Sequence, residues 1–417
     1  MQCKRSLNSL IMLMLMSSSL VSAQSADSFK TDEYNAMGPN VLDVVNAASA
    51  YAQGYTGKGV IVGISDSPIN FLNPEFDLKQ NSEMVNIADD GVYDWADITH
   101  GTHVAGIVDA SKNGIGMHGI AFDAEIKGAA AGNGYHNGSF YSRDDLYAYY
   151  LQHPEIKIIN NSWMSSYQLE NISDKEAYEL LQNGILTPGG NPVWEDSVYN
   201  QTIIFREMVA QDKLLIWCAG NEGRTMAHLE SMTPVFDQSL SNNFITVTAS
   251  NAEELSRNNN GGFDADCNSI ATFSSLAQYR EDSTLNAPGV YIDSANANFA
   301  ADGMTDVLMS GTSQAAPMVT GVGALVQQAF PYLGGKQIGD VLLSTANNNI
   351  TAVDGFFINM HDDAGQYKVN IFFTGKKTDT DKALEVAYKK NGLFFYLGYG
   401  IKSLDELKKI ELDIFEN

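Results

Sequence analysis

The chain has 417 residues, of which 44% are hydrophobic and 18% are charged. This balance is ordinary for a globular protein, and the length is sufficient for a large buried core. The 50 acidic residues outnumber the 25 basic ones, so the formal net charge is -25. Such an acidic chain is not expected to bind nucleic acid or anionic membrane surfaces.

Residues 1–23 have the pattern of a signal peptide. Lys4 and Arg5 precede an apolar stretch from Leu10 to Met16, and Val21-Ser22-Ala23 offers the small residues that a signal peptidase requires. The apolar stretch is too short to span a membrane, and no later segment is long enough. The sequence therefore predicts export to the cell surface or the medium, with no membrane-spanning segment in the mature chain.

The first predicted strand is the apolar run from Val60 to Ser65, and the carboxylate of Asp66 follows it directly. In open α/β sheets the active crevice lies beyond the carboxyl ends of the strands. Asp66 is therefore well placed to orient a catalytic imidazole.

The candidate imidazole lies in the segment Thr99-His100-Gly101-Thr102-His103. Its glycine and the small residues after it predict the start of a helix that packs closely against neighbouring backbone. His100 is the candidate general base. His100 and His103, three residues apart, could instead be two metal ligands, but no nearby Glu or Cys completes a set. Otherwise His103 belongs to the core.

A third polar group follows the predicted buried strand Leu214–Cys218. The chain continues there as Ala219-Gly220-Asn221, and Gly-Asn is a turn signal. The turn would bring the Asn221 amide to the same sheet edge as Asp66. An amide in that place can donate a hydrogen bond to an oxyanion formed during acyl transfer.

The fourth polar group is Ser313, which opens an apolar run that ends near Phe330 and predicts a buried helix. Pro317 suits the first turn of this helix, where proline is tolerated. A serine at a helix start can attack a carbonyl whose oxygen is then stabilised by free amide N–H groups and the helix dipole. The alternative is that Ser313 only caps the helix.

Further along the chain, predicted strands alternate with predicted helices. Strands are expected near Glu125–Ala129, Ile156–Asn160 and Phe244–Thr248, and helices near Val104–Ala110, Asp144–Gln152 and Ile203–Gln211. Parallel strands need such crossovers. The pattern predicts one α/β unit with a doubly wound, mostly parallel sheet.

Asp66, His100, Asn221 and Ser313 resemble the subtilisin-like serine protease family in residue type and in chain order. The triad order and the oxyanion asparagine of that family are well known. The most specific motifs are His-Gly-Thr-His and Gly-Thr-Ser-Gln-Ala-Ala-Pro, and the similarity runs from Gly57 to about Ala346.

The resemblance implies a serine endopeptidase that acts on proteins or peptides and needs no cofactor for its chemistry. Asp66 would be the orienting acid, His100 the general base, Ser313 the nucleophile and Asn221 the oxyanion donor. The nearest branch of the family is the autotransporter type. Too few residues separate Ala23 from Asp66 for a folded propeptide, which many relatives carry.

One motif departs from the family, because Pro68 follows Asp66-Ser67 where glycine is usual. Proline fixes its own φ and biases Ser67 towards extended backbone, so the turn after Asp66 could lie differently. This departure leaves a second hypothesis open, a subtilisin-fold binding or adhesive protein with an impaired triad.

Two segments resemble the walls of the family's first specificity pocket. One consists of Ser162, Trp163 and Met164, and the facing one of Cys218, Ala219 and Gly220. Without the resemblance they would be the ends of two core strands. Met164 stands where glycine is usual, and its flexible apolar side chain would narrow the mouth of the pocket.

Two structural features remain open. Asn73-Pro74-Glu75 and the segment from Ser111 to Met117 align with the family's common calcium loop, so a structural calcium ion is possible although no metal site is assigned. Cys218 and Cys267 could form a disulfide, but a buried free thiol is equally plausible for Cys218.

The peptidase domain is expected to span residues 24–417. Two polar stretches, near 165–201 and 347–396, read as surface insertions in this domain.

Overall fold

The structure is a computed structural model of the whole chain. It describes residues 25–85, 98–130, 134–136, 139–141, 143–164, 202–224, 226–257, 263–264, 270–277, 280, 283–346, 357–362, 365–370 and 376–377. The predicted leader, the predicted insertion 165–201 and Cys267 lie outside these residues.

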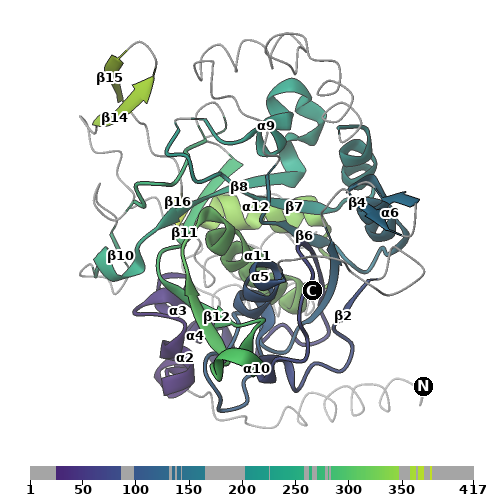
Figure 1. Cartoon of the computed structure of the whole chain (residues 1–417), viewed down its shortest axis with the longest axis vertical. Helices are drawn as coiled ribbons and strands as arrows, with labels where there is room; N and C mark the ends of the chain where they lie inside the picture. The colour runs from purple at the N-terminus through teal and green to yellow at the C-terminus, as the bar shows by residue number, and fades with distance from the viewer. Residues whose placement is uncertain are drawn as a thin grey trace, which may run out of the picture.

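An eight-stranded sheet forms the centre of the molecule (Figure 1). Its strands follow the order β16-β11-β8-β7-β6-β1-β3-β2, and every neighbouring pair is parallel. Their bounds are β1 Ile61–Asp66, β2 Glu83–Met84, β3 Glu125–Ala130, β6 Ile158–Asn161, β7 Leu214–Cys218, β8 Phe244–Ser250, β11 Thr284–Pro288 and β16 Lys376–Lys377. The predicted doubly wound, mostly parallel fold is confirmed.

The strand order reverses between β1 and β6. From β1 the chain first adds β3 on one side, and then returns to add β6 on the other side. In open parallel sheets such a switch point leaves a crevice beyond the carboxyl ends of the two strands. Asp66 ends β1 and Ser162 directly follows β6, so both flank this crevice.

Both faces of the sheet are covered by helices, as the strand sequences require. All five residues of β7 and all seven of β8 are buried, which fits strands covered on both sides. One core includes apolar residues of α5 (Thr99–Asp109), α11 (Thr312–Ala329) and α12 (Gly335–Thr345). The other includes Tyr147 and Tyr150 of α6 (Arg143–Gln152) and Phe205 of the helical segment 202–210.

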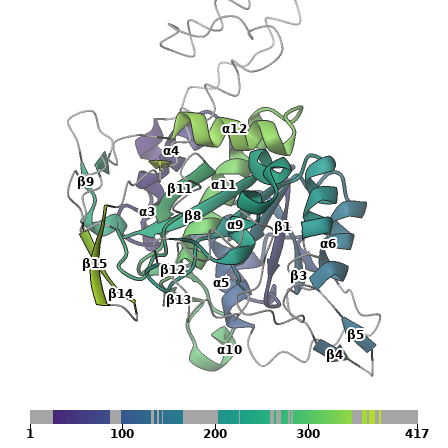
Figure 2. The ribbon, with the colours of Figure 1, turned by 90° about the horizontal axis from the view of Figure 1, so that it is seen from above.

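The two helices that carry the catalytic motifs pack against each other. Figure 1 shows α5 and α11 together at the centre of the molecule, and Figure 2 shows them from above. Gly321 of α11 also lies close to Ile120, in the segment between α5 and β3, because a Cβ at Gly321 would stand 2.7 Å from the Cβ of Ile120. Close packing of this kind fixes the start of α11 relative to the sheet.

The segment after the predicted leader belongs to the core. It forms η1 (Ala26–Phe29), α2 (Asp32–Ala36), α3 (Val41–Val44) and α4 (Ala47–Ala52). The Tyr51 hydroxyl donates to the Ile120 carbonyl at 2.7 Å and is buried. The lead-in therefore supplies the first elements of the catalytic unit.

The remaining elements are short. Among the described residues, four two-stranded sheets pair β4 (Gly134–His136) with β5 (Ser139–Tyr141), β9 (Ser256–Arg257) with β10 (Phe263–Asp264), β12 (Ile292–Ala295) with β13 (Asp306–Met309) and β14 (Phe357–Asp362) with β15 (Gly365–Asn370). Two short helices are α9 (Leu229–Phe236) and α10 (Phe299–Asp302). Three 3-10 turns are η2 (Pro74–Phe76), η3 (Gln238–Asn243) and η4 (Ala252–Glu254). The predicted insertion 347–396 contributes β14 and β15 and also β16, which pairs with β11 in the main sheet. None of the described helices is both long and apolar enough to cross a membrane.

Candidate active site

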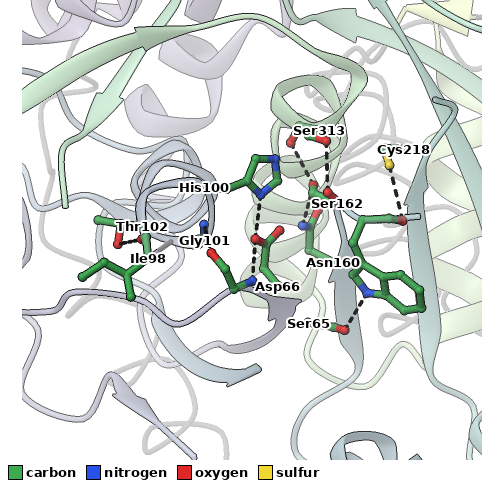
Figure 3. A network of polar contacts seen from close by, with 12 residues as sticks. Ser65, Asp66, Ile98, His100, Gly101, Thr102, Asn160, Ser162, Cys218 and Ser313 are labelled. Carbon is green, nitrogen blue, oxygen red and sulfur yellow. Dashed lines mark hydrogen bonds and ion pairs between the residues drawn. The ribbon is translucent and has the colours of Figure 1, made fainter. Parts of the chain in front are cut away.

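The predicted acid and base form a hydrogen-bonded pair at the edge of the sheet. Asp66 is only 2% exposed, and its Oδ1 atom accepts hydrogen bonds from the Ser67 amide and from His100 Nδ1, each at 2.7 Å. His100 is the second residue of α5, and its side chain is 35% exposed. Because Nδ1 holds its proton towards Asp66, the Nε2 atom is available as a base (Figure 3).

The turn after Asp66 accommodates Pro68 without disturbing this pair. Ser67 Oγ accepts a hydrogen bond from the Gly101 amide at 2.8 Å. A Cβ on Gly101 would stand 2.0 Å from the Ser67 carbonyl oxygen, so only glycine allows this approach. The turn and the start of α5 thereby hold each other, and the Asp66–His100 hydrogen bond has normal geometry.

Ser313 lies in the first turn of α11, as expected for a nucleophile at a helix start. The helix begins at Thr312, and Ser313 is 8% exposed. Its Oγ atom donates to the Ser162 carbonyl at 3.0 Å (Figure 3). Pro317 was expected in the first turn, and this expectation is wrong. It is the sixth residue of the helix, so it removes a hydrogen bond from the helix interior.

Asn221 is oriented by the residue that precedes the nucleophile. Its Oδ1 atom accepts hydrogen bonds from the Thr312 amide at 2.8 Å and from the Thr312 hydroxyl at 3.0 Å. The Gly220 amide in turn donates to Thr312 Oγ1 at 3.0 Å. Because the carbonyl end of the side chain is held in this way, the Nδ2 donor is fixed beside the start of α11. Thr312 was missed by sequence reasoning, although it stands inside the Gly-Thr-Ser motif.

The residues of the first predicted pocket wall differ in where their side chains lie. The Trp163 indole donates to Ser65 Oγ at 2.8 Å and packs against Trp217 with ring centroids 5.1 Å apart. It thus joins the second core and leaves its backbone beside the crevice. Met164 is 37% exposed, as a residue at a pocket mouth would be. Ser162 is buried against the nucleophile.

The facing wall consists of Cys218, Ala219 and Gly220, which are all buried at the end of β7. Cys218 is a free thiol in the structure. Its Sγ atom lies 3.7 Å from the Trp163 carbonyl oxygen and thereby connects the two walls.

A buried polar cluster behind Cys218 was not predicted from the sequence. His228 places Nε2 3.7 Å from Cys218 Sγ and Nδ1 2.9 Å from Glu230 Oε2. Burial alone would lower the pKa of His228, but its hydrogen bonds to Cys218 and Glu230 raise the pKa to about 10. His228 therefore carries a positive charge at neutral pH and balances the buried Glu230 carboxylate. His228 and Glu230 are two residues apart in the chain, but their burial and the contact with Cys218 arise only in the fold.

His103 is a core residue, which decides against the metal hypothesis for the His100–His103 pair. Its Nε2 atom lies 3.1 Å from the Ile292 carbonyl oxygen and 2.9 Å from that of Val307. Burial lowers its pKa to about 4, so the ring is neutral. Within the described residues no group of three or more His, Cys, Asp or Glu side chains could hold a metal ion.

The segments that align with the family's calcium loop lie together and enclose a buried carboxylate. Glu75 is fully buried, and its carboxylate has no hydrogen bond of good geometry in the described part of the chain, although the Thr305 side chain and the Met117 backbone lie close enough to lower its pKa. A Cβ on Gly116 would stand 2.1 Å from Glu75 Oε1 and 2.9 Å from Asp306 Oδ2, so both carboxylates approach the same point. Oxygen ligands of this type suit calcium, and Glu75 with Asp306 would hold such an ion.

The neighbouring loop is held by contacts within the protein. The amides of Asn113 and Gly114 donate to Glu33 Oε1 at 2.7 and 3.0 Å. The Asn113 side chain donates to the Pro74 carbonyl at 3.0 Å and to Asp77 Oδ1 at 2.9 Å. These contacts leave Glu75 as the group whose charge needs compensation, by a proton or by a cation.

We expect Glu75→Gln to stabilise the metal-free protein above neutral pH. Burial, followed by the charges of Asp306 and Glu33, raises the pKa of Glu75 to about 8. A raised carboxyl pKa contributes stability that is complete below about pH 4.5 and is lost as the pH rises towards 8. The variant should therefore gain on the order of 3 kcal/mol at pH 9 and nothing at pH 4. Chemical denaturation in EDTA across this pH range measures the difference.

The same variant tests the calcium proposal. If Glu75 ligates calcium, millimolar Ca²⁺ should raise the Tm of the wild type at pH 8 and leave Glu75→Gln unchanged. The exposed Glu254→Gln serves as the control and should behave as the wild type does. An equal calcium response of the wild type and Glu75→Gln would contradict a site at this carboxylate.

The fold and the edge residues together define the class of α/β serine hydrolases. A sequence profile of the subtilase family matches residues 57–400, which is most of the chain. The chain therefore belongs to the subtilase family of serine peptidases, and the predicted resemblance is confirmed.

Relatives of known sequence and structure agree with this membership. An extracellular serine protease of Serratia marcescens is 29% identical over 79% of this chain, and this chain covers only 33% of that protein. A second extracellular serine protease of Serratia marcescens is 30% identical over 78% of this chain, and this chain covers 32% of that protein. Subtilisin NAT of Bacillus subtilis subsp. natto is 26% identical over 75% of this chain. The solved structure of the prenylagaramide maturation protease PagA shares the fold, with a TM-score of 0.51, 19% identity and coverage of 82% of this chain and 98% of its own.

Proposed function

We propose that the chain is an exported serine endopeptidase that hydrolyses proteins or peptides through an acyl-enzyme. The observation that carries this proposal is the Asp66–His100 hydrogen bond, which stands at the same sheet edge as Ser313. Export is supported by the signal-peptide pattern of residues 1–23 and by the extracellular relatives. The net charge of -25 argues against nucleic acid as a partner.

The reaction follows from what each group can do. Ser313 Oγ attacks the scissile carbonyl while His100 Nε2 accepts its proton, and Asp66 holds the imidazole in the required tautomer. Negative charge then develops on the former carbonyl oxygen. Asn221 Nδ2 and the free amides at the start of α11 donate hydrogen bonds to it. His100 next protonates the leaving amine, and a water molecule activated by the same imidazole releases the acyl group.

A serine-directed fluorophosphonate tests this function most directly. The purified wild type should form one covalent adduct on Ser313 and should degrade casein. Ser313→Ala should do neither and should remain folded with a modestly lower Tm, because the buried Ser162 carbonyl loses its donor. An adduct on another residue, or casein hydrolysis by Ser313→Ala, would exclude the proposed mechanism.

The second hypothesis, a binding or adhesive protein with an impaired triad, rests on Pro68. The structure accommodates Pro68 beside a normal Asp66–His100 hydrogen bond, so the geometry favours the enzyme. A binding protein would retain its fold and its ligand but would fail to react with the fluorophosphonate.

We expect Met164 to restrict the first specificity pocket. Met164 is 37% exposed and lies two residues after Ser162, where its side chain would narrow the entrance for a large substrate side chain. Phe and Tyr before the scissile bond should be disfavoured by roughly 1 to 3 kcal/mol relative to slender side chains, the scale on which apolar pockets discriminate size. Met164→Gly should recover the bulky substrates on a peptide library varied at that position.

Met304→Gly is the matched control for Met164→Gly. Met304 is also an exposed methionine, with 56% of its surface accessible, and it lies just before β13. The control variant should keep the profile of the wild type. Equal use of Phe by the wild type and Met164→Gly would mean that Met164 points away from the bound substrate.

A further inference from the structure

The carbonyl of Ser313 lacks the usual helical hydrogen bond from the residue four positions later. In an α-helix each carbonyl accepts the N–H of the residue four positions later. For Ser313 that residue is Pro317, which has no N–H to donate. The Ser313 carbonyl instead accepts a hydrogen bond from the hydroxyl of Ser162, at 2.8 Å. A side chain from the end of β6 thus completes the helix turn that carries the nucleophile.

The same two residues share a second hydrogen bond in the opposite direction. Ser313 Oγ donates to the Ser162 carbonyl at 3.0 Å. Both residues are buried, and Figure 3 shows the two bonds side by side. This Ser162–Ser313 pair joins the start of α11 to the end of β6 at two points, so the helix start can neither rotate nor slide without breaking one of them.

Residues behind Ser162 determine which way its hydroxyl points. Asn160 Nδ2 donates to Ser162 Oγ at 2.9 Å, and the Thr320 hydroxyl lies 3.0 Å from Asn160 Oδ1. Asn160, Ser162 and Thr320 are all buried. Because Ser162 Oγ accepts from Asn160, its own proton is directed to the Ser313 carbonyl. A fully satisfied buried network of this kind is rigid.

We propose that the Ser162 hydroxyl is a positioning residue for the nucleophile, a role beyond the pocket wall predicted from the sequence. It holds the first turn of α11 through the carbonyl that Pro317 leaves free. This inference rests on the proposed function of Ser313. During attack the Ser313 hydroxyl transfers its proton to His100, while the bond from Ser162 to the Ser313 carbonyl persists. The Ser162 hydroxyl therefore affects the rate of attack by Ser313 rather than the affinity for substrate.

Three variants test the proposal. Ser162→Ala removes the hydroxyl and keeps the backbone carbonyl, and it should lower kcat by about 10- to 100-fold with little change in KM, because displaced reacting groups lose rate. It should also lower the Tm, since a buried carbonyl loses its donor. Pro317→Ala supplies an N–H that can satisfy this carbonyl within the helix. The double variant should therefore regain the lost Tm and retain the low kcat.

The double variant separates positioning from simple stability. If kcat recovers together with the Tm, the hydroxyl only satisfies a buried carbonyl, and the proposal is wrong. Wild-type kcat in Ser162→Ala would also overturn it. If Ser162→Ala alone does not fold, kcat of the double variant is compared with kcat of Pro317→Ala. An equal kcat in these two variants would overturn the positioning role of the Ser162 hydroxyl. The rate of fluorophosphonate labelling should fall in parallel with kcat.

Two controls accompany these measurements. Thr345→Val removes a buried hydroxyl that donates to the Val341 carbonyl at 2.7 Å in α12, and it should alter the Tm without altering kcat. Ser313→Ala distinguishes the two proposals. If it remains active, the proposed function fails. If it is inactive while Ser162→Ala matches the wild type, the function stands and only the positioning role fails.

Discussion

His100→Ala should lower kcat/KM for peptide hydrolysis by about four to six orders of magnitude. The size of the effect is that known for subtilisin, in which loss of one triad member costs nearly as much as loss of all three. The physical reason is that Ser313 cannot release its proton without a base, and Asp66 without the imidazole orients nothing. Rates with a chromogenic peptide, corrected for active sites, measure the loss.

His153→Ala is the matched control for this variant. His153 also places Nδ1 2.8 Å from a carboxylate, that of Glu155, and its side chain is 35% exposed like that of His100. It lies directly after α6, away from Ser313, so we expect unchanged kcat/KM. A fall of similar size in both variants would indicate a general effect on folding, and an active His100→Ala would remove this residue from the triad.

Asn221→Leu should lower kcat by about two to three orders of magnitude with little change in KM. Leucine is similar in size to asparagine and cannot donate to the oxyanion. Substrate binds before that charge develops, so the loss falls on the transition state. The Thr312 amide and hydroxyl would also lose their acceptor, Asn221 Oδ1. Part of the fall in kcat therefore reflects the loss of these two hydrogen bonds.

The fluorophosphonate provides a second readout for Asn221. Labelling of Asn221→Leu should become slower without disappearing, since Ser313 and His100 remain in place. Asn35→Leu, a substitution of an exposed asparagine on α2, should label at the wild-type rate. If Asn221→Leu raises KM and keeps kcat, the side chain serves the shape of the turn and not the oxyanion.

Local patterns in the sequence were sufficient to predict much of the framework. Leu214–Cys218 was predicted with both its ends correct, because a short, continuous apolar run buried on both faces has few other solutions. The helix of Ser313 begins one residue earlier than predicted, at Thr312. Asp66 is the last residue of β1 and Asn221 comes three residues after the end of β7, and the carboxyl ends of parallel strands meet at one edge. Strand ends and motif order therefore predicted the site before any contact was known.

The sequence by itself therefore determined the fold class, five of the eight strands of the main sheet and the candidate residues at their ends, since these depend on periodicity and on neighbours in the chain. Only the tertiary structure decided how those residues are held. The Ser162–Ser313 pair joins residues 151 positions apart, and Asn160 and Thr320 are 160 positions apart. The neutrality of His103 and the charge balance of Glu75 likewise depend on burial by distant segments. Desolvation and hydrogen bonding act through space, so the groups that set them leave no periodic trace along the chain.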